Sequence, residues 1–518
     1  MSKASIALNR FGLGARGDQP VPADPVGWLT GQFARYDPHP DAIAGAATSA
    51  AVSAELADYF RQQRALRAQQ GGRRAMPPAG AAAVAPMPGA APAGLEMGAQ
   101  AVQPPGMTPP IMAAPAKPPR DDAMKQARQF AARAGREDYA GAVGARATQA
   151  LITDTPFVER LVHFWANHFA VSADKLQVVG LAGTLEFEAI RPHVLGSFHD
   201  MLMAVEQHPA MLLYLDQAVS VGPNSPLGQR IAARAAVNGG RKVGLNENLA
   251  REILELHTLG VRTGYSQTDV TEFARAMTGW TVAGIGQGPG ARAAGTDGLP
   301  GDFVFAAPLH EPGDRVVMGK TYPAGGVEQA SAVLADVAVS PATATHIATK
   351  LARHFAGDTP PPAMVARLQA AFVKSGGDLP TVYRALIASP EAWVEQPLKF
   401  KTPWEWTISS MRALNVKTAD PQAMVGLLNQ LGQPIWKPGQ PVGYDDIAGS
   451  WAGPDAVLRR VEAAERFASR AAATDARALA PKILPGAVSP GTTTALANCE
   501  SPAQALALLL VAPEFMRR

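Results

Sequence analysis

The sequence of 518 residues has only one cysteine, Cys499, and little excess of either charge. A single cysteine cannot form an intramolecular disulfide or a multi-cysteine metal site, and it fits a reducing compartment. The 47 Lys and Arg residues nearly balance the 44 Asp and Glu residues, which leaves a formal net charge of +3. Because no basic run is interleaved with aromatic residues, we expect no nucleic-acid partner.

Long apolar runs are also missing. No segment approaches the ~18 apolar residues of a membrane span, and Met1–Arg10 lacks the apolar core of about 7–15 residues that marks a signal peptide. We therefore expect no membrane span and a cytoplasmic location.

Several catalytic motifs do not occur in the sequence. There is no Gly-x-Ser-x-Gly elbow and no phosphate-binding loop, and the glycines of 284–290 do not open a helix, so a dinucleotide site is not expected. His310 is followed by a glutamate but not by a second histidine four residues later, which excludes the helical zinc-protease motif. The missing elbow and the missing phosphate-binding loop remove two common classes of enzyme.

The chain is nevertheless 47% hydrophobic and long enough to bury a large core. Residues 69–120 are dominated by Pro, Ala, Gly and Met, and this composition predicts a disordered insertion. We expect an N-terminal helical part at 1–68 and a main helical body at 121–518.

The body is predicted to be mainly α-helical and globular, with many helices and one small β-hairpin. Periodic apolar positions and capping residues predict helices at 156–170, 182–191, 199–206, 210–216, 245–259 and 267–278, with further helices opening at Ser340-Pro341 and at Asp378. The only extended region follows a glycine-rich stretch at 281–302, where 303–305 and 315–318 are expected to pair as the hairpin.

The segment 246–260 carries unusually organised polar residues for an amphipathic helix. At about 100° per residue one third of its circumference is polar, beside an apolar stripe. The polar residues are Asn248, Arg251, Glu252 and Glu255, and the apolar ones are Leu249, Ile253 and Leu256. The alternative interpretation is a solvated helix face with an Arg251–Glu255 ion pair.

Six segments together resemble the bacterial family called domain of unknown function 1800. They are Phe164–Phe169, Asn246–Leu256, Ala276–Trp280, His310 with Gly319-Lys320, Lys401–Glu405 and Leu431–Pro434. The resemblance implies a large bacterial protein of unsettled activity, with an exported sulfatase-like or alkaline-phosphatase-like protein as its partner. Many members carry an export signal that this N-terminus lacks, so the resemblance also allows a periplasmic location reached by co-export.

Glu252 and Glu255 are the leading candidates for catalysis. At i,i+3 spacing each carboxylate can raise the pKa of the other, and Asp216 can add a third. Such a group can divide into proton donor and base, as in glycosidases, or bind a hard cation through oxygen ligands. Structural pairing with Arg251 is the competing interpretation.

Two histidines complete the predicted catalytic set. His168 lies on a very apolar helix and is either an acid/base group or a satisfied core residue, whereas His163 points about 140° away and cannot readily share a metal with it. Loop placement favours a functional role for His310.

Substrate contacts are expected from polar and aromatic side chains of the resembling segments. The residues are Asn167, Asn248, Arg251, Asp216, Lys401 and Trp404, with the tryptophan as a platform for a sugar. The leading hypothesis is a hydrolase-like enzyme acting on a glycan. The alternatives are a non-catalytic binding or assembly partner of the exported sulfatase-like or phosphatase-like protein, and a carboxylate–histidine metal protein. The sequence identifies no cofactor.

Overall fold

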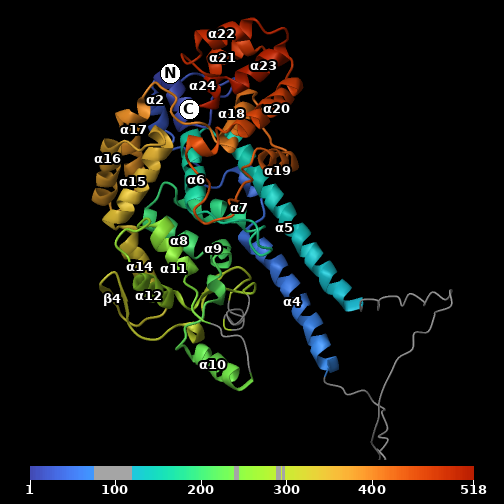
Figure 1. The fold of residues 1–518 in the computed structure, drawn as a ribbon, viewed down its shortest axis with the longest axis vertical. Coiled ribbons are helices and arrows are strands. Elements are labelled where there is room, and N and C mark those ends of the chain that lie inside the picture. Colours follow the sequence, from blue (N-terminus) through green and yellow to red (C-terminus); the bar gives the residue numbers. More distant parts are fainter. Residues whose placement is uncertain (75–118, 239–243, 287–292, 294–297) are drawn as a thin grey trace, which may run out of the picture. The chain divides into compact units, whose positions relative to one another are not determined.

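A computed structural model describes residues 1–74, 119–238, 244–286, 293 and 298–518. These residues are mostly helical, with two short antiparallel hairpins, which confirms the predicted mainly α-helical class (Figure 1). The described residues group into two compact units, 1–57 with 132–518, and 58–131. Most of the insertion predicted at 69–120 lies outside the described residues.

The first half of the chain contains the following elements. They are α1 (Lys3–Ile6), η1 (Ala7–Phe11), α2 (Pro25–Thr30), α3 (Asp41–Ala44), α4 (Ser49–Arg74), α5 (Pro119–Ile152), α6 (Pro156–His168), α7 (Ala182–Thr184), η2 (Leu185–Ile190), η3 (Arg191–His193), α8 (Phe198–Glu206), α9 (Pro209–Tyr214), η4 (Gln217–Val219), α10 (Pro226–Asn238), α11 (Asn248–Glu252), η5 (Ile253–His257) and α12 (Gln267–Met277).

The second half begins with the hairpins and returns to helices. Its elements are β1 (Trp280–Val282), β2 (Phe303–Phe305), η6 (Ala307–Leu309), β3 (Arg315–Val317), β4 (Lys320–Tyr322), α14 (Val327–Ala338), α15 (Pro341–Ala356), α16 (Pro362–Ser375), α17 (Leu379–Ile387), η7 (Pro390–Trp393), α18 (Pro403–Ala413), α19 (Pro421–Gln430), η8 (Ala448–Ser450), α20 (Pro454–Arg470), α21 (Ala476–Ile483), α22 (Pro490–Ala497), α23 (Pro502–Val511) and α24 (Pro513–Met516).

Capping residues place the helix starts as the sequence predicts. Pro156 occupies the first turn of α6, and Ser340 accepts a hydrogen bond from the backbone N of Ala342 at the start of α15. Asp378 caps α17 through the backbone N of Thr381. These local signals depend only on neighbouring residues, which is why the sequence reveals them.

The predicted helix at 245–259 is not continuous, and this part of the prediction is wrong. α11 ends at Glu252 and continues as the π-helix η5. A π-turn has a wider period than an α-turn, so the inward-facing positions shift. Leu254 and His257 are fully buried, whereas Leu256, expected on the apolar stripe, is only half-buried.

The expected pairing of 303–305 with 315–318 is also wrong. β2 pairs with β1, and β3 pairs with β4 in a separate hairpin. The second hairpin closes through Met318 and Gly319, which both have positive φ, as a tight two-residue turn requires. β3 therefore pairs with a strand nearer in the sequence than predicted, whereas β2 pairs with one that lies farther away.

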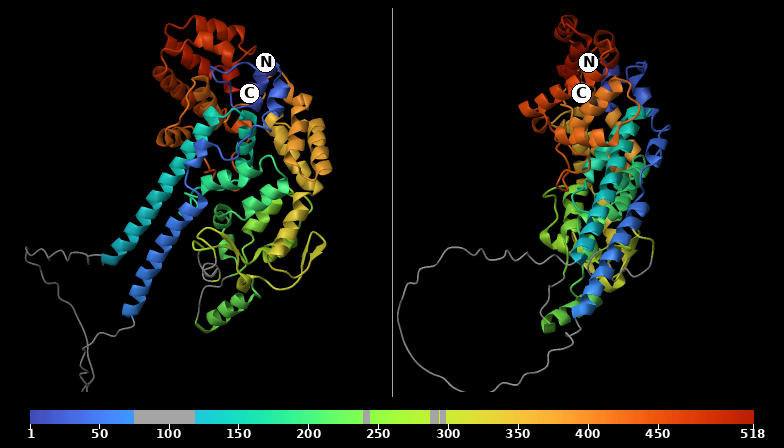
Figure 2. Two further views of the ribbon diagram at one scale, coloured as in Figure 1. Left: turned by 180° about the vertical axis from the view of Figure 1, so that it is seen from behind. Right: turned by 90° about the vertical axis from the view of Figure 1, so that its right-hand side faces the viewer.

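The larger unit places α6 in its interior. Phe157, Leu161 and Trp165 have no exposed surface, and the charged side chains of Glu159 and Arg160 on the same helix are buried as well. α15 and α16 lie side by side in both views of Figure 2. Within the described ranges no helix is long and apolar enough to cross a membrane.

Candidate functional site

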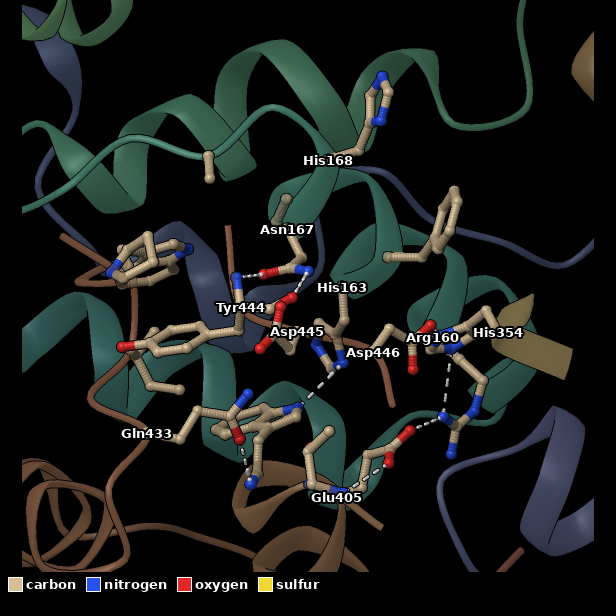
Figure 3. Close-up of a pocket in the computed structure, with 18 of the residues that line it drawn as sticks. Arg160, His163, Asn167, His168, His354, Glu405, Gln433, Tyr444, Asp445 and Asp446 are labelled. Atoms are coloured by element: carbon tan, nitrogen blue, oxygen red, sulfur yellow. Dashed lines mark hydrogen bonds and ion pairs between the residues drawn. The ribbon is translucent and has the colours of Figure 1, made fainter. Parts of the chain in front are cut away.

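A cavity of about 220 Å³ lies in the larger unit, where α6, α15 and α18 meet the loop 433–446 (Figure 3). Aromatic surface comes from Phe164, Trp404, Trp436 and Tyr444, and α5 contributes Arg146. Charged groups from α15 and the loop complete the lining. The cavity thus combines apolar walls with ionisable side chains.

Asn167 fixes the loop that forms one wall. Its side-chain Nδ2 donates to the backbone O of Tyr444 at 2.8 Å, and its Oδ1 accepts from the backbone N of Tyr444, also at 2.8 Å. Gly443, with φ of 79°, precedes this contact, and a Cβ there would overlap the backbone O of Asn167. The amide therefore positions the next two residues, Asp445 and Asp446, at the cavity (Figure 3).

A buried ion-pair network forms the floor of the cavity. Glu405 completes the capping box of α18 by accepting from the backbone N of Thr402 at 2.9 Å. The same carboxylate pairs with Arg160 and, at 2.8 Å, with the Nε of Arg518. Burial opposes ionisation, but Arg518 and Arg160 outweigh it and hold the pKa of Glu405 well below its usual range. Glu405 is therefore a structural anion rather than a proton donor.

His354 and Asp446 form a second pair in this network. The ring Nδ1 lies 2.8 Å from Asp446 Oδ2, and Lys399 Nζ lies 3.0 Å from the other carboxylate oxygen. Burial lowers the pKa of His354 to about 4, so the ring is neutral at pH 7. Its Nε2 faces Arg160 and Arg518 at 3.5 Å, which favours the tautomer that donates from Nδ1 to Asp446.

The aromatic wall is held by indole hydrogen bonds. Trp404 Nε1 donates to His163 Nδ1 at 3.2 Å, and Trp436 Nε1 donates to Glu186 at 2.9 Å. The guanidinium of Arg146 lies 4.4 Å from the Trp404 ring centroid and pairs with Glu186. Arg146 is therefore already paired by the protein.

Three charged side chains of the lining have no oppositely charged partner within 4.0 Å among the described residues. They are Lys350 and Arg353 on α15, and Asp445 in the loop. The Nε of Arg353 is shielded from solvent and has no hydrogen-bond partner. Asp445 accepts one hydrogen bond, from Ser450 Oγ at 2.8 Å. These are the groups available to a ligand.

Only some of the predicted site residues line the cavity. Asn167, His168 and Trp404 line the cavity. The structure places the other predicted residues outside that lining; they are Glu252, Glu255, His310, Asn248, Arg251, Asp216 and Lys401. His168 is buried, with Nε2 3.0 Å from the backbone O of His257, and burial holds its pKa well below the ordinary value.

On the Asn246 segment, the expected Arg251–Glu255 pair is not formed. Arg251 instead contacts Glu247 at 3.1 Å and Gln267 at 2.9 Å. Glu252 lies half-buried, and burial, opposed by His257 and assisted by Glu255, raises its pKa. Burial is thus the main cause of the shift, and Glu255 contributes less.

The remaining predicted residues have local partners. His310 Nδ1 lies 2.8 Å from the backbone O of Thr278. Asp216, which has a φ of 58°, pairs with Lys175 at 2.7 Å and is exposed, as is Asn248.

Lys401 is sealed in the core. Its Nζ donates to Ser409 Oγ at 3.0 Å and lies 4.1 Å from the Phe515 ring centroid. Burial lowers the pKa of Lys401 to about 7.

Sequence reasoning missed Lys350, Arg353 and His354. Arg353 and His354 follow Lys350 by three and four residues, so all three lie on one side of α15, and this spacing is the signal that the sequence offers. The Arg160–Glu405 contact joins residues 245 positions apart and has no local signature. In the part of the chain that the structure describes, no group of three or more His, Cys, Asp or Glu side chains is arranged to hold a metal ion.

Comparison with family models identifies the family to which the chain belongs. The model of the family described as "Protein of unknown function (DUF1800)" matches residues 6–517. The chain belongs to the DUF1800 family. Neither a curated protein nor a solved structure matches it. Because the match covers nearly the whole chain, the DUF1800 region includes the helices and the loop that form the cavity.

Proposed function

We propose that this DUF1800 protein is a hydrolase-like enzyme that binds a glycan residue in the cavity and acts on it by acid/base chemistry. The observation that carries the proposal is the presence of unpaired ionisable groups beside the aromatic side chains of Trp404, Trp436 and Tyr444. Aromatic surface with a few convergent polar groups is the usual composition of a ligand site. The volume, about 220 Å³, is below the ~300–1,000 Å³ typical for drug-sized ligands and suits one small ring.

Asp445 is the proposed base. It is the lining carboxylate without a cationic partner in the described residues, whereas Glu405 and Asp446 are each paired. A carboxylate without an ion-pair partner can accept a proton from the water that attacks the glycosidic carbon, and the departing glycosidic oxygen takes up a proton from solvent. Asn167 acts as a positioning residue because its two hydrogen bonds hold the backbone of Tyr444, next to Asp445.

The experiment compares two carboxylate sites in one protein. The purified protein is screened against a panel of glycans and esters, and any activity is measured again in Asp445→Asn, Glu252→Gln and Glu255→Gln. We expect Asp445→Asn to lower kcat at least about 100-fold, as loss of a general base does, while the other two variants retain activity. Loss of activity only in the Glu252 and Glu255 variants would move the site to the Asn246 segment, in agreement with the original sequence hypothesis.

A second candidate is a non-catalytic partner of an exported sulfatase-like or alkaline-phosphatase-like protein, co-exported to the periplasm. The observation that favours it is the partial exposure of Arg251, Glu247 and Gln267, which form a polar cluster at the surface. Absence of any activity, together with a stable complex that Arg251→Glu disrupts, would favour this candidate. A complex unaffected by that substitution would count against this surface.

A further inference from the structure

Two cations of α15 face the cavity without counter-charges. Lys350 and Arg353 are one turn apart on the helix, and both line the cavity. Neither makes an ion pair within 4.0 Å or a side-chain hydrogen bond to a described residue, and the Nε of Arg353 is shielded from solvent. The shielded Nε of Arg353 therefore lacks a polar partner in the fold, and an anionic ligand would supply one.

Most charged side chains of the cavity lining have an oppositely charged partner. Arg146 pairs with Glu186, and Arg160 shares Glu405 with Arg518. Asp446 is neutralised by Lys399, which lies outside the lining. The charges left over are Lys350, Arg353 and Asp445, so two positive charges remain against one negative charge. This excess of unpaired positive charge favours an anionic ligand.

The surroundings of Lys350 support the same conclusion. Burial lowers the pKa of its ammonium to about 8, Asp446 raises it, and Arg353 lowers it. His168 and His346 also face Lys350, and burial lowers the pKa of both below the ordinary value of 6.5. At pH 7 these histidines are neutral and add no charge beside this amine.

We propose that Lys350 and Arg353 form a carboxylate-binding subsite and that the ligand is a sugar acid with one negative charge, such as a hexuronate. The guanidinium can present parallel N–H donors to the two oxygens of a carboxylate, and the ammonium adds a point charge. Aromatic side chains of the same cavity would contact the sugar ring. This inference rests on the proposed function for its sugar component, but the anion subsite can be tested separately.

The test is calorimetric titration of the full chain with glucuronate, methyl glucoside, acetate and inorganic phosphate. We expect glucuronate to bind and to lose at least about tenfold in affinity in Lys350→Met and in Arg353→Met. The matched control is Lys437→Met, because Lys437 is an exposed lysine beside the cavity that pairs with Asp174 instead of lining it. This control should bind glucuronate like the natural protein.

Proton uptake provides a measurement that needs no variant. With a pKa of about 8, Lys350 is half protonated at pH 8, and a bound carboxylate should raise that pKa. Binding at pH 8 should therefore take up roughly half a proton, seen as a dependence of the binding enthalpy on the ionisation enthalpy of the buffer. No uptake would overturn the role of Lys350 even if its variants fail to fold.

The relative affinities for the four ligands separate the carboxylate subsite from the proposed function. Equal affinity for methyl glucoside and glucuronate would overturn the carboxylate subsite while leaving the proposed function intact. Tighter binding of phosphate than of glucuronate, lost in Lys350→Met, would overturn the choice of a singly charged carboxylate. Acetate binding that depends on Lys350, with no binding of either sugar, would uphold the anion subsite and count against the glycan function alone.

Discussion

Replacing Lys401 by methionine should make the protein more stable at neutral pH. Lys401 is 1% exposed, and its ammonium has one hydrogen bond, to Ser409, and one aromatic contact, with Phe515. The folded protein lowers its pKa from 10.5 to about 7, chiefly through burial. Because the unfolded chain binds this proton more tightly, the contribution of Lys401 to stability is least unfavourable above pH 10.5 and becomes more unfavourable as the pH drops to 7.

The size of the stability change follows from the pKa shift of Lys401. A displacement of about 3.5 pKa units corresponds to roughly 4 kcal/mol of lost stability at pH 7, where the folded lysine is half protonated. Methionine avoids this cost and fills similar space beside Phe515, while the lost cation–π contact is worth only about 0.5–2 kcal/mol. The balance favours the variant by about 2–3 kcal/mol.

Lys399 offers a matched control two residues away. It is 2% exposed, but its ammonium lies 3.0 Å from both Asp358 and Asp446. Lys399→Met leaves those carboxylates without this cation and should destabilise the fold by about 3–5 kcal/mol. Urea-unfolding midpoints at pH 7 and pH 9 compare the two variants. If Lys401→Met is destabilised as much as Lys399→Met, the amine is a required partner and the reasoning from burial is wrong.

Three further predictions concern the loop, the histidines and the π-helix. Gly443→Ala should weaken ligand binding in calorimetry, because a Cβ would displace the loop; unchanged affinity would show that the loop position does not matter. Burial lowers the pKa of His346 and of His354 from 6.5 to about 4, so stability is present above pH 6.5 and is lost as the pH falls towards 4, by up to about 3 kcal/mol for each residue. Urea midpoints that stay constant from pH 7.5 to 4.5 would contradict this. Leu254→Ala should cost about 2–5 kcal/mol in urea unfolding and Leu256→Ala clearly less, because only the former is fully buried; the reverse order would favour a continuous α-helix.

The fold class and most helix starts could be predicted because their causes are local. Pro156 and Asp378 act on the turn that follows them, and the apolar spacing of α15 depends on near neighbours. The switch to a π-helix after Glu252 has no such signal. It depends on tertiary packing that buries Leu254 and His257, which the sequence alone does not show.

The candidate site was predictable only in part for the same reason. Asn167 and Trp404 were found because they lie in recognisable segments, and both line the cavity. The pairing of Arg160 with Glu405, and of His354 with Asp446, unites residues distant in the sequence. Which ionisable groups remain unpaired depends on all these contacts together, so Lys350 and Arg353 could be recognised only in three dimensions.

The contact made by Asn167 has a consequence for how this protein can diverge. The amide bonds to the backbone of residue 444 and not to its side chain, so this contact does not depend on which side chain stands at position 444. Gly443 is constrained, but Val442, an exposed residue of the lining, is free to change. New ligand preferences can therefore arise by substitution at the rim without rebuilding the scaffold.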